Sequence, residues 1–211
     1  MSTPYFSALL LVMSPGLVHA DTCRRGDCAN GVGAFLWSDG DRYSGEFSGG
    51  SPSGLGVYRV PGQQRYAGEW AHGKREGAGV IVFDDGRNYR GEFDAGGKMH
   101  GLGVQSWTGE HRVARGYDEV AEPGQFEGAF KNGVWWGRGR ITRGVKHPDT
   151  GESVTLSDEG LYEKGKLINA ESVDDAVAAA KAAAAHAEEV AKAARAKARE
   201  ANMLPLHKAD L

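Results

Sequence analysis

The fold of this chain is decided by the stretch Tyr66-Ala67-Gly68-Glu69-Trp70, which is followed by Gly73-Lys74 and then by Gly77-Ala78-Gly79. The same pattern begins 23 residues earlier at Tyr43 and 23 residues later at Tyr89. Self-similarity at a fixed period in this range is the signature of a stacked-repeat architecture. We therefore predict that the chain folds as an array of small, similar units.

The array is predicted to span residues 43–168, with a fourth unit that begins at Phe126 and a degenerate fifth that begins near Asp158. The fourth unit starts 37 residues after the third rather than 23, which leaves an insertion around Glu110–Pro123. A second insertion lies around Val145–Ser153. Because insertions in repeat arrays map to loops, we expect the first to be a solvated loop.

The residues of one unit predict its local structure. Side chains alternate along a strand, so Tyr66, Gly68 and Trp70 lie on one face. The glycine leaves a notch between the two rings, into which a ring of the next unit fits. Gly73-Lys74 predicts a turn, and Gly77–Phe83 predicts a second strand that returns beside the first. Each unit is therefore expected to be one β-hairpin.

A single hairpin is too small to be stable, so neighbouring units must stack and bury their aromatic faces. The predicted fold is mainly β: an elongated, twisted antiparallel sheet of stacked β-hairpins, with one long C-terminal α-helix. The rings expected to stack are Tyr43, Phe47, Tyr66, Trp70, Tyr89, Phe93, Phe126, Phe130 and Tyr162.

The sequence carries no catalytic motif. The Gly-x-Gly pairs stand at turn and strand positions of the repeats with no following helix, which excludes a dinucleotide-binding loop. Glu46, Glu69, Glu92 and Glu127 recur in the units, and we predict a shared structural hydrogen bond for them rather than general acid catalysis. We therefore predict no catalytic residue, no cofactor and no metal site.

Residues 1–20 have the pattern of a secretory signal peptide, with an apolar core at Tyr5–Met13 and a cleavage site before Asp21. No Lys or Arg lies in this segment, and the alternative is an uncleaved apolar leader. A signal peptide predicts a secreted, periplasmic or lumenal protein. The alternative is an intracellular protein associated with a membrane.

Residues 21–42 are expected to form a half-repeat that caps the array, because their glycines fall at the offsets of later repeat glycines. Cys23 and Cys28 lie in this cap, and we predict a disulfide between them, since two thiolates alone cannot complete a zinc site. The loop between them contains an Arg-Gly-Asp tripeptide, which we attribute to chance rather than to receptor binding.

Residues 171–201 are rich in alanine and contain no Gly or Pro, which predicts a helix, followed by a tail at 202–211. Small apolar residues recur in a heptad pattern. This seam predicts docking of a partner helix or self-association, and the alternative is a solvated single helix. The seam consists of Val173, Val177, Ala180, Ala184, Ala187, Ala191, Ala194 and Ala198.

The repeats resemble those of the MORN family, named for membrane occupation and recognition nexus. Its pattern is matched almost completely from Tyr66 to Gly86, and the resemblance covers roughly Cys23 to Lys166. The opening cysteine segment is similar to the start of exported bacterial MORN proteins. One departure is an extra residue around Gly97 in the third unit.

The resemblance implies a non-enzymatic scaffold that docks a protein partner through its sheet face and its C-terminal helix. The alternative that the family name implies is a peripheral module that binds phospholipid membranes. The net charge of −3 argues against nucleic acid as a partner and predicts that any membrane contact is weak. MORN arrays also accompany catalytic domains, but no segment of this chain is long enough to be one.

Overall fold

The computed structural model describes residues 21–108, 123–146 and 153–205. The predicted signal peptide, most of both insertions and residues 206–211 lie outside the described residues. The strands are β1 (Thr22–Gly26), β2 (Val32–Leu36), β3 (Arg42–Ser48), β4 (Ser51–Val60), β5 (Gln64–Ala71), β6 (Lys74–Phe83), β7 (Asn88–Phe93), β8 (Met99–Trp107), β9 (Gly124–Lys131), β10 (Val134–Lys146), β11 (Ser153–Glu163) and β12 (Lys166–Ala170), and the helix is α1 (Asp174–Met203).

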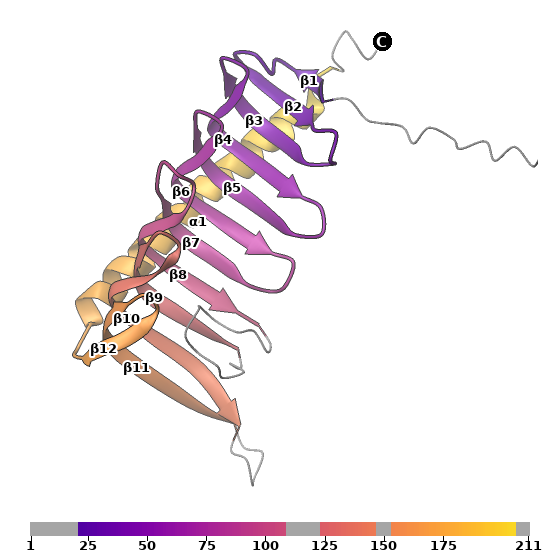
Figure 1. The fold of residues 1–211 in the computed structure, drawn as a ribbon. Coiled ribbons are helices and arrows are strands. Elements are labelled where there is room, and N and C mark those ends of the chain that lie inside the picture. The colour runs from indigo at the N-terminus through magenta and orange to yellow at the C-terminus, as the bar shows by residue number, and fades with distance from the viewer. Residues whose placement is uncertain (1–20, 109–122, 147–152, 206–211) are drawn as a thin grey trace, which may run out of the picture.

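The strands form one antiparallel sheet in which each pairs with the next along the chain, in the order β1 to β12 (Figure 1). The pair β1–β2 caps the array, and five hairpins follow, from β3–β4 to β11–β12. An open sheet of stacked hairpins with one long C-terminal helix is the fold that the repeat pattern predicted. That prediction is confirmed.

Most hairpins close with a two-residue turn. His72, Asn132 and Lys164 have φ of 51°, 55° and 52°, and each precedes a glycine that also has positive φ. The first hairpin uses Gly49 and Gly50, with φ of 56° and 75°. Positive φ at both turn positions matches the twist of the strands, which explains why glycine recurs at this point.

Each of the first three hairpins contains a β-bulge that the repeated glutamate completes. Gly77, with φ of 83°, lies in the bulge of β6, and the next residue, Ala78, donates its backbone N–H to Glu69 Oε2 at 2.6 Å. The equivalent bonds run from Leu55 N to Glu46 at 2.6 Å and from Leu102 N to Glu92 at 2.7 Å. A bulge leaves ladder groups unpaired, and the carboxylate replaces the lost acceptor. The structural role predicted for these three glutamates is confirmed.

The same prediction is wrong for Glu127. Gly128 pairs with Gly103 and Gly139, just as Gly68 pairs with Gly56 and Gly79, so Gly128 is the equivalent of Gly68. Glu127 therefore precedes the repeat glycine, whereas Glu69 follows it. The position equivalent to Glu69 is Ala129. Glu127 is only 4% exposed, accepts a hydrogen bond from the Gln125 side chain at 3.1 Å, and lies 3.5 Å from Lys181 Nζ on α1.

The predicted stacking rings form one continuous chain through the sheet. In sequence of contact they are Phe47, Tyr43, Trp70, Tyr66, Phe93, Tyr89, Phe130, Phe126 and Tyr162, with successive centroids 4.8–5.4 Å apart and planes nearly perpendicular. Edge-to-face contacts of this kind add stability beyond the area they bury. Each leading ring therefore contacts one ring of its own unit and one of the next unit.

The leading ring of each unit lies directly over glycines. A Cβ atom on Gly79 would lie 2.4 Å from Tyr66 Oη and 2.6 Å from Tyr66 Cε2. The Tyr66 hydroxyl donates to the carbonyl of Glu69 at 2.9 Å, and burial raises the pKa of Tyr66 well above its ordinary value. The absence of a side chain on the glycine is what admits the ring.

We predict that Gly79→Ala lowers the free energy of unfolding by about 3 kcal/mol, because the new methyl group displaces the Tyr66 ring. Gly133→Ala is the matched control, since its turn has positive φ but no atom within 4 Å of the added Cβ. That variant should cost only about 1 kcal/mol from its backbone. Equal costs in urea denaturation would show that the ring does not require the glycine.

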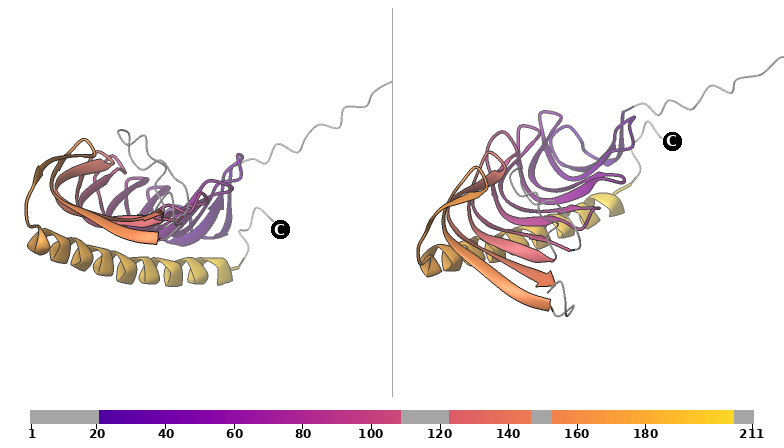
Figure 2. Two further views of the ribbon diagram at one scale, coloured as in Figure 1. Left: turned by 90° about the horizontal axis from the view of Figure 1, so that it is seen from below. Right: turned by 60° about the horizontal axis from the view of Figure 1, so that its bottom comes forward.

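Helix α1 runs along the outer, convex side of the curved sheet, from β10 toward β1 (Figure 2). It begins three residues later than the expected start at residue 171 and ends at Met203. All eight residues of the predicted seam, from Val173 to Ala198, are 0–8% exposed. The sequence predicted a partner helix or solvent at this seam, and the structure instead places the chain's own sheet there.

The small size of alanine determines how closely the helix approaches. Ala187, Ala191 and Ala194 pack in one buried cluster with Ala67, Ala78 and Val80 of the sheet, flanked by Val57 and Val190. A seam without large side chains was read as a site for another helix, but it fits equally well on a sheet face built from alanine and valine. The heptad spacing shows which side of α1 is buried and does not show what covers it.

Ion pairs join the helix to successive strands. Arg140 Nη2 lies 2.6 Å from Asp174, Lys181 pairs with Glu127, and Arg90 Nη1 lies 3.9 Å from Glu188. The pairs of Arg140 and Arg90 are partly exposed and contribute little stability. Glu127 is buried, so Lys181 supplies a counter-charge that it would otherwise lack. The three pairs distinguish one position of the helix from another shifted by a turn, because a shift would separate all of them.

We predict that Ala191→Glu releases α1 from the sheet, because it places an unpaired carboxylate in the alanine contact, at a cost of about 3 kcal/mol. Ala193→Glu is the control on the exposed side of the same helix, and it should change the free energy of unfolding by less than about 0.5 kcal/mol. Limited proteolysis between β12 and α1, together with urea denaturation, measures both effects. Similar behaviour of the two variants would contradict the packing described above.

Candidate functional site

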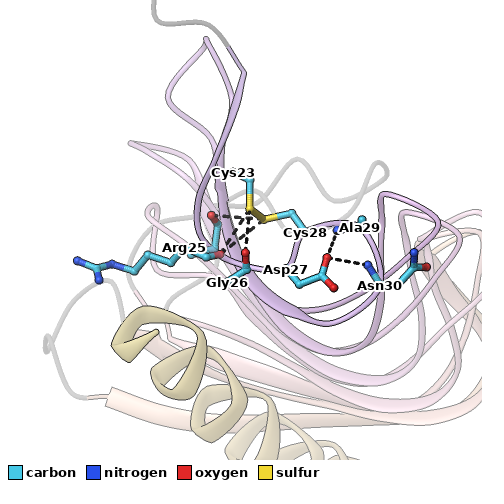
Figure 3. Close-up of a disulfide and its surroundings, with 8 residues drawn as sticks. Cys23, Arg25, Gly26, Asp27, Cys28, Ala29 and Asn30 are labelled. Atoms are coloured by element: carbon cyan, nitrogen blue, oxygen red, sulfur yellow. Dashed lines mark hydrogen bonds between the residues drawn. A yellow bond between two sulfur atoms is a disulfide. The ribbon is translucent and has the colours of Figure 1, made fainter. Parts of the chain in front are cut away.

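The first candidate site is the cysteine loop of the cap, for which the sequence predicts a disulfide (Figure 3). Cys23 and Cys28 form a disulfide, and Asp27 Oδ1 accepts hydrogen bonds from the backbone N–H groups of Ala29 at 2.8 Å and Asn30 at 3.0 Å. Arg25 Nη1 donates to the carbonyl of Leu204 at 2.7 Å. The loop therefore closes the β1–β2 cap and ties it to the end of the helix.

The Arg-Gly-Asp tripeptide in this loop has internal partners. Arg25 and Asp27 make the bonds just described, and a Cβ on Gly26 would lie 2.2 Å from the carbonyl oxygen of Val32. Arg25, Gly26 and Asp27 therefore each have a structural role within the cap. These contacts fit the interpretation of the tripeptide as a chance occurrence.

The second candidate site is the trough, which we define as the concave face of the sheet opposite α1. The buried ring chain forms its floor. A second row of side chains, one from each hairpin, covers this floor. Each residue of the row stands two positions after the turn glycine of its hairpin. On the neighbouring strand it pairs with the last aromatic residue of the same hairpin. The row consists of Pro52, Arg75, Met99, Trp135 and Leu167. Four of these five residues are apolar.

The turns at the edge of the trough are joined by backbone hydrogen bonds. Gly73 N donates to Pro52 O at 2.9 Å, Gly133 N to Met99 O at 2.9 Å and Gly165 N to Trp135 O at 3.0 Å. The turn of β7–β8 contains the extra residue and behaves differently. There Gly97 N donates to Asp94 O, within its own turn, at 2.8 Å.

An open cavity of about 410 Å³ lies in the trough beside this longer turn. Aromatic walls line it: the Trp37 and Tyr58 centroids are 5.7 Å apart, and those of Tyr58 and Trp70 are 5.8 Å apart. Arg75, Lys74, Gln64 and Gly97 complete the lining, with Pro52, Gly73 and Gly96. A volume of this size is typical of pockets that hold a small ligand or a few residues of a peptide.

Two groups in the cavity have shifted pKa values. Burial raises the pKa of Tyr58, and its hydroxyl also donates a hydrogen bond to the Asp41 carboxylate, which raises it further. Burial lowers the pKa of Arg75, although the nearby Tyr66 and Tyr58 partly offset this effect. Arg75 nevertheless stays charged at neutral pH, because arginine starts from a very high value.

A basic row lies on the convex face, beyond the edge of the helix contact. Arg42 pairs in register with Arg59, and Arg59 pairs with Arg65, so three exposed arginines stand side by side on β3, β4 and β5. Like charges in directly opposed positions repel one another. This row is the second surface feature that the core does not explain.

The repeat pattern matches the MORN repeat family at residues 29–42, 43–62, 66–86, 89–112 and 126–144. This chain is a MORN-repeat protein. MORN repeats are non-catalytic modules, and the last hairpin, β11–β12, lies outside the matched residues. No curated protein matches the chain.

Two further features concern residues 21–108, 123–146 and 153–205, which the structure describes. Among them, no group of three or more His, Cys, Asp and Glu side chains is placed to hold a metal ion. No helix in that part of the MORN protein is long and apolar enough to cross a membrane.

Sequence reasoning missed the covering row and the trough walls. Trp135 stacks on Phe126 with centroids 4.5 Å apart, yet it was not among the predicted rings. The signal was present in the MORN units, because the covering residue always follows the turn glycine by two positions. Aligning the units at that glycine would have shown Arg75 as the exception.

We predict that loss of the Cys23–Cys28 bond costs about 2 kcal/mol, because the bond closes a loop of only six residues and restrains the unfolded chain modestly. Dithiothreitol should therefore lower the Tm of the protein by about 5 °C. The Cys23→Ser/Cys28→Ser double variant should start at the lower Tm and not respond to reductant. A response in that variant would show that the effect does not come from this bond.

Proposed function

We propose that this protein is a non-enzymatic scaffold that binds a segment of a protein partner in its trough. One observation carries the proposal. The convex face of the sheet is covered by the chain's own helix, whereas the concave face holds an open cavity of about 410 Å³ with aromatic walls.

The composition of the trough supports a protein partner. Trp37, Tyr58, Phe83 and Met99 are half-buried there and leave part of each side chain accessible. Tryptophan, tyrosine, methionine and arginine are the residue types enriched at protein interfaces. Relative to the expectation from sequence, the partner is moved from the alanine seam of the helix to the sheet face, and α1 acts as a support that holds the curvature.

Export of the protein is part of this proposal. A disulfide in the cap fits an oxidising compartment, which is where a cleaved signal peptide would deliver the chain. Mass spectrometry of the native protein tests this point. A mature N-terminus at Asp21 is expected, and a native protein that retains residues 1–20 would overturn it.

The proposal is tested by site-specific photo-crosslinking in cells of the source organism. A photoreactive phenylalanine in place of Gln64, which lines the cavity, should form crosslinks to one defined partner protein, with the crosslinked peptide mapping to a single segment. The same group in place of Ala193, on the exposed side of α1, is the control and should not. Equal crosslinking from both positions, or none from Gln64, would contradict binding in the trough.

A second candidate function is binding to an anionic phospholipid surface, and the row Arg42, Arg59 and Arg65 favours it. The overall charge of −3 opposes it. Co-sedimentation with phosphatidylserine vesicles across a salt series separates the two functions. We expect weak binding. Strong, salt-sensitive binding that disappears in the Arg42→Gln/Arg59→Gln/Arg65→Gln variant would replace the scaffold proposal with the membrane function.

A further inference from the structure

Arg75 occupies a position that the fold reserves for apolar side chains. The equivalent residues Pro52, Met99, Trp135 and Leu167 all cover the ring chain. The Arg75 guanidinium lies in the same place, 5.8 Å from the ring centroids of both Tyr66 and Phe93. A residue that breaks a structural rule kept by its equivalents is a sign of function.

Within the described residues, the groups that interact with the Arg75 charge are aromatic side chains, Tyr66, Tyr58 and Phe93, and none of them is a carboxylate. Other arginines of the same protein are paired: Arg138 lies 2.6 Å from Asp175, and Arg140 lies 2.6 Å from Asp174. Contacts with two rings offset only part of the cost of removing a guanidinium from water. Burial accordingly lowers the pKa of Arg75, the direction expected for a partly desolvated guanidinium.

The longer turn of β7–β8 gives access to this guanidinium. In the neighbouring hairpins the turn glycine bonds to the covering residue before it, as Gly73 does to Pro52 and Gly133 to Met99. The Arg75 carbonyl receives no such bond, because Gly97 N donates instead to Asp94 O within its own turn. The cavity lies between Arg75 and this turn. The longer turn of β7–β8 and the charged side chain of Arg75 therefore lie next to each other, on opposite sides of the cavity.

We propose that the cavity binds the carboxylate of an aspartate or glutamate side chain in the partner segment, with Arg75 as its ligand. This inference rests on the proposed function and specifies the residue that the trough recognises. The planar guanidinium presents two parallel N–H donors that match the two oxygens of a carboxylate. The partner's carboxylate supplies the anion that Arg75 otherwise lacks.

The charges around the cavity favour a monoanion. Lys74 at the rim and Arg75 contribute two positive charges, whereas Asp39 and Asp41 both place negative charge near Tyr58 on the opposite wall. The Asp41 carboxylate accepts the Tyr58 hydrogen bond. A phosphate group carries nearly two negative charges and would lie near this carboxylate. A single carboxylate on Arg75 is repelled less by these acidic groups than a phosphate would be.

The walls of the cavity specify the neighbour of the acidic residue. Trp37 and Tyr58 are half-buried and lie edge-to-face, and Trp70 lies beyond them. An aromatic or large aliphatic side chain next to the carboxylate would cover these rings. From the cavity the trough continues along the hairpins from β7 to β12, which suits a side chain of an extended partner segment.

The test uses the full chain from Asp21 and a phage-displayed library of random twelve-residue peptides. Peptides selected on the wild-type protein should contain Asp or Glu next to an aromatic or aliphatic residue. A synthetic peptide of the enriched sequence should bind at least about tenfold more weakly when its acidic residue is replaced by Asn or Gln. Selected peptides without this acidic residue, or no selection above background, would overturn the inference.

The variant Arg75→Met distinguishes a binding role from a structural one, because methionine is the residue that the third hairpin uses at this position. We expect this variant to lose at least about tenfold in affinity for the acidic peptide. Its Tm should stay unchanged or rise by about 2 °C, since a poorly solvated charge is removed. Arg199→Met, which removes an exposed arginine from α1, is the control and should change neither quantity.

The remaining outcomes also decide the question. Unchanged peptide affinity in Arg75→Met would overturn the inference, and so would a loss of stability large enough to account for the loss of binding. The crosslinking from Gln64 is independent of the charge of the ligand. A partner crosslinked there that shows no preference for acidic residues would therefore leave the scaffold function standing and remove only the role of Arg75.

Discussion

The contact between an aromatic ring and a pair of glycines is the constraint on which the rest of the structure depends. In the second hairpin, Tyr66 lies over Gly68 and Gly79, and a methyl group on either glycine would collide with it. The ring can then reach both the last ring of its own hairpin and that of the next. A repeating contact of this kind links hairpins that could not fold alone, and it produces a continuous core without a second sheet.

The remaining features adapt to this contact. The bulges let each hairpin bend around the rings, and Glu69 and its equivalents satisfy the backbone groups that bending releases. The rings occupy the inside of the bend, so the outside is left with small residues such as Ala67 and Ala78. A helix of small residues can lie directly on that surface. The two faces thus differ in kind: one is closed by the chain itself, and the other has depth and aromatic walls.

Much of this architecture could be read from the sequence, because periodicity is a local signal that each unit repeats independently. The hairpins, the rings and three of the four glutamates follow from it. The prediction fails for Glu127 because this residue precedes the repeat glycine, whereas the other three glutamates follow it. The position of α1 on the sheet and the partial burial of the Arg75 guanidinium depend on tertiary packing. A heptad of alanine fits a helix or a sheet, and an arginine two residues after a turn becomes unusual only when the five hairpins are compared.

Because α1 lies across the strands, the length of the helix is matched to the number of hairpins beneath it. Seven helical residues rise by about 10.5 Å, and one hairpin occupies two strand spacings, or about 9.6 Å. Accordingly, Lys181 and Glu188 are seven residues apart and meet strands β9 and β7, one hairpin apart. The helix therefore serves as a ruler for the array. Helix α1 makes its main contacts with β1 to β10, so a duplication that added one hairpin within this range would leave two further strands uncovered, besides β11 and β12, unless it also added a heptad. The number of hairpins that the helix covers is therefore tied to the length of the helix.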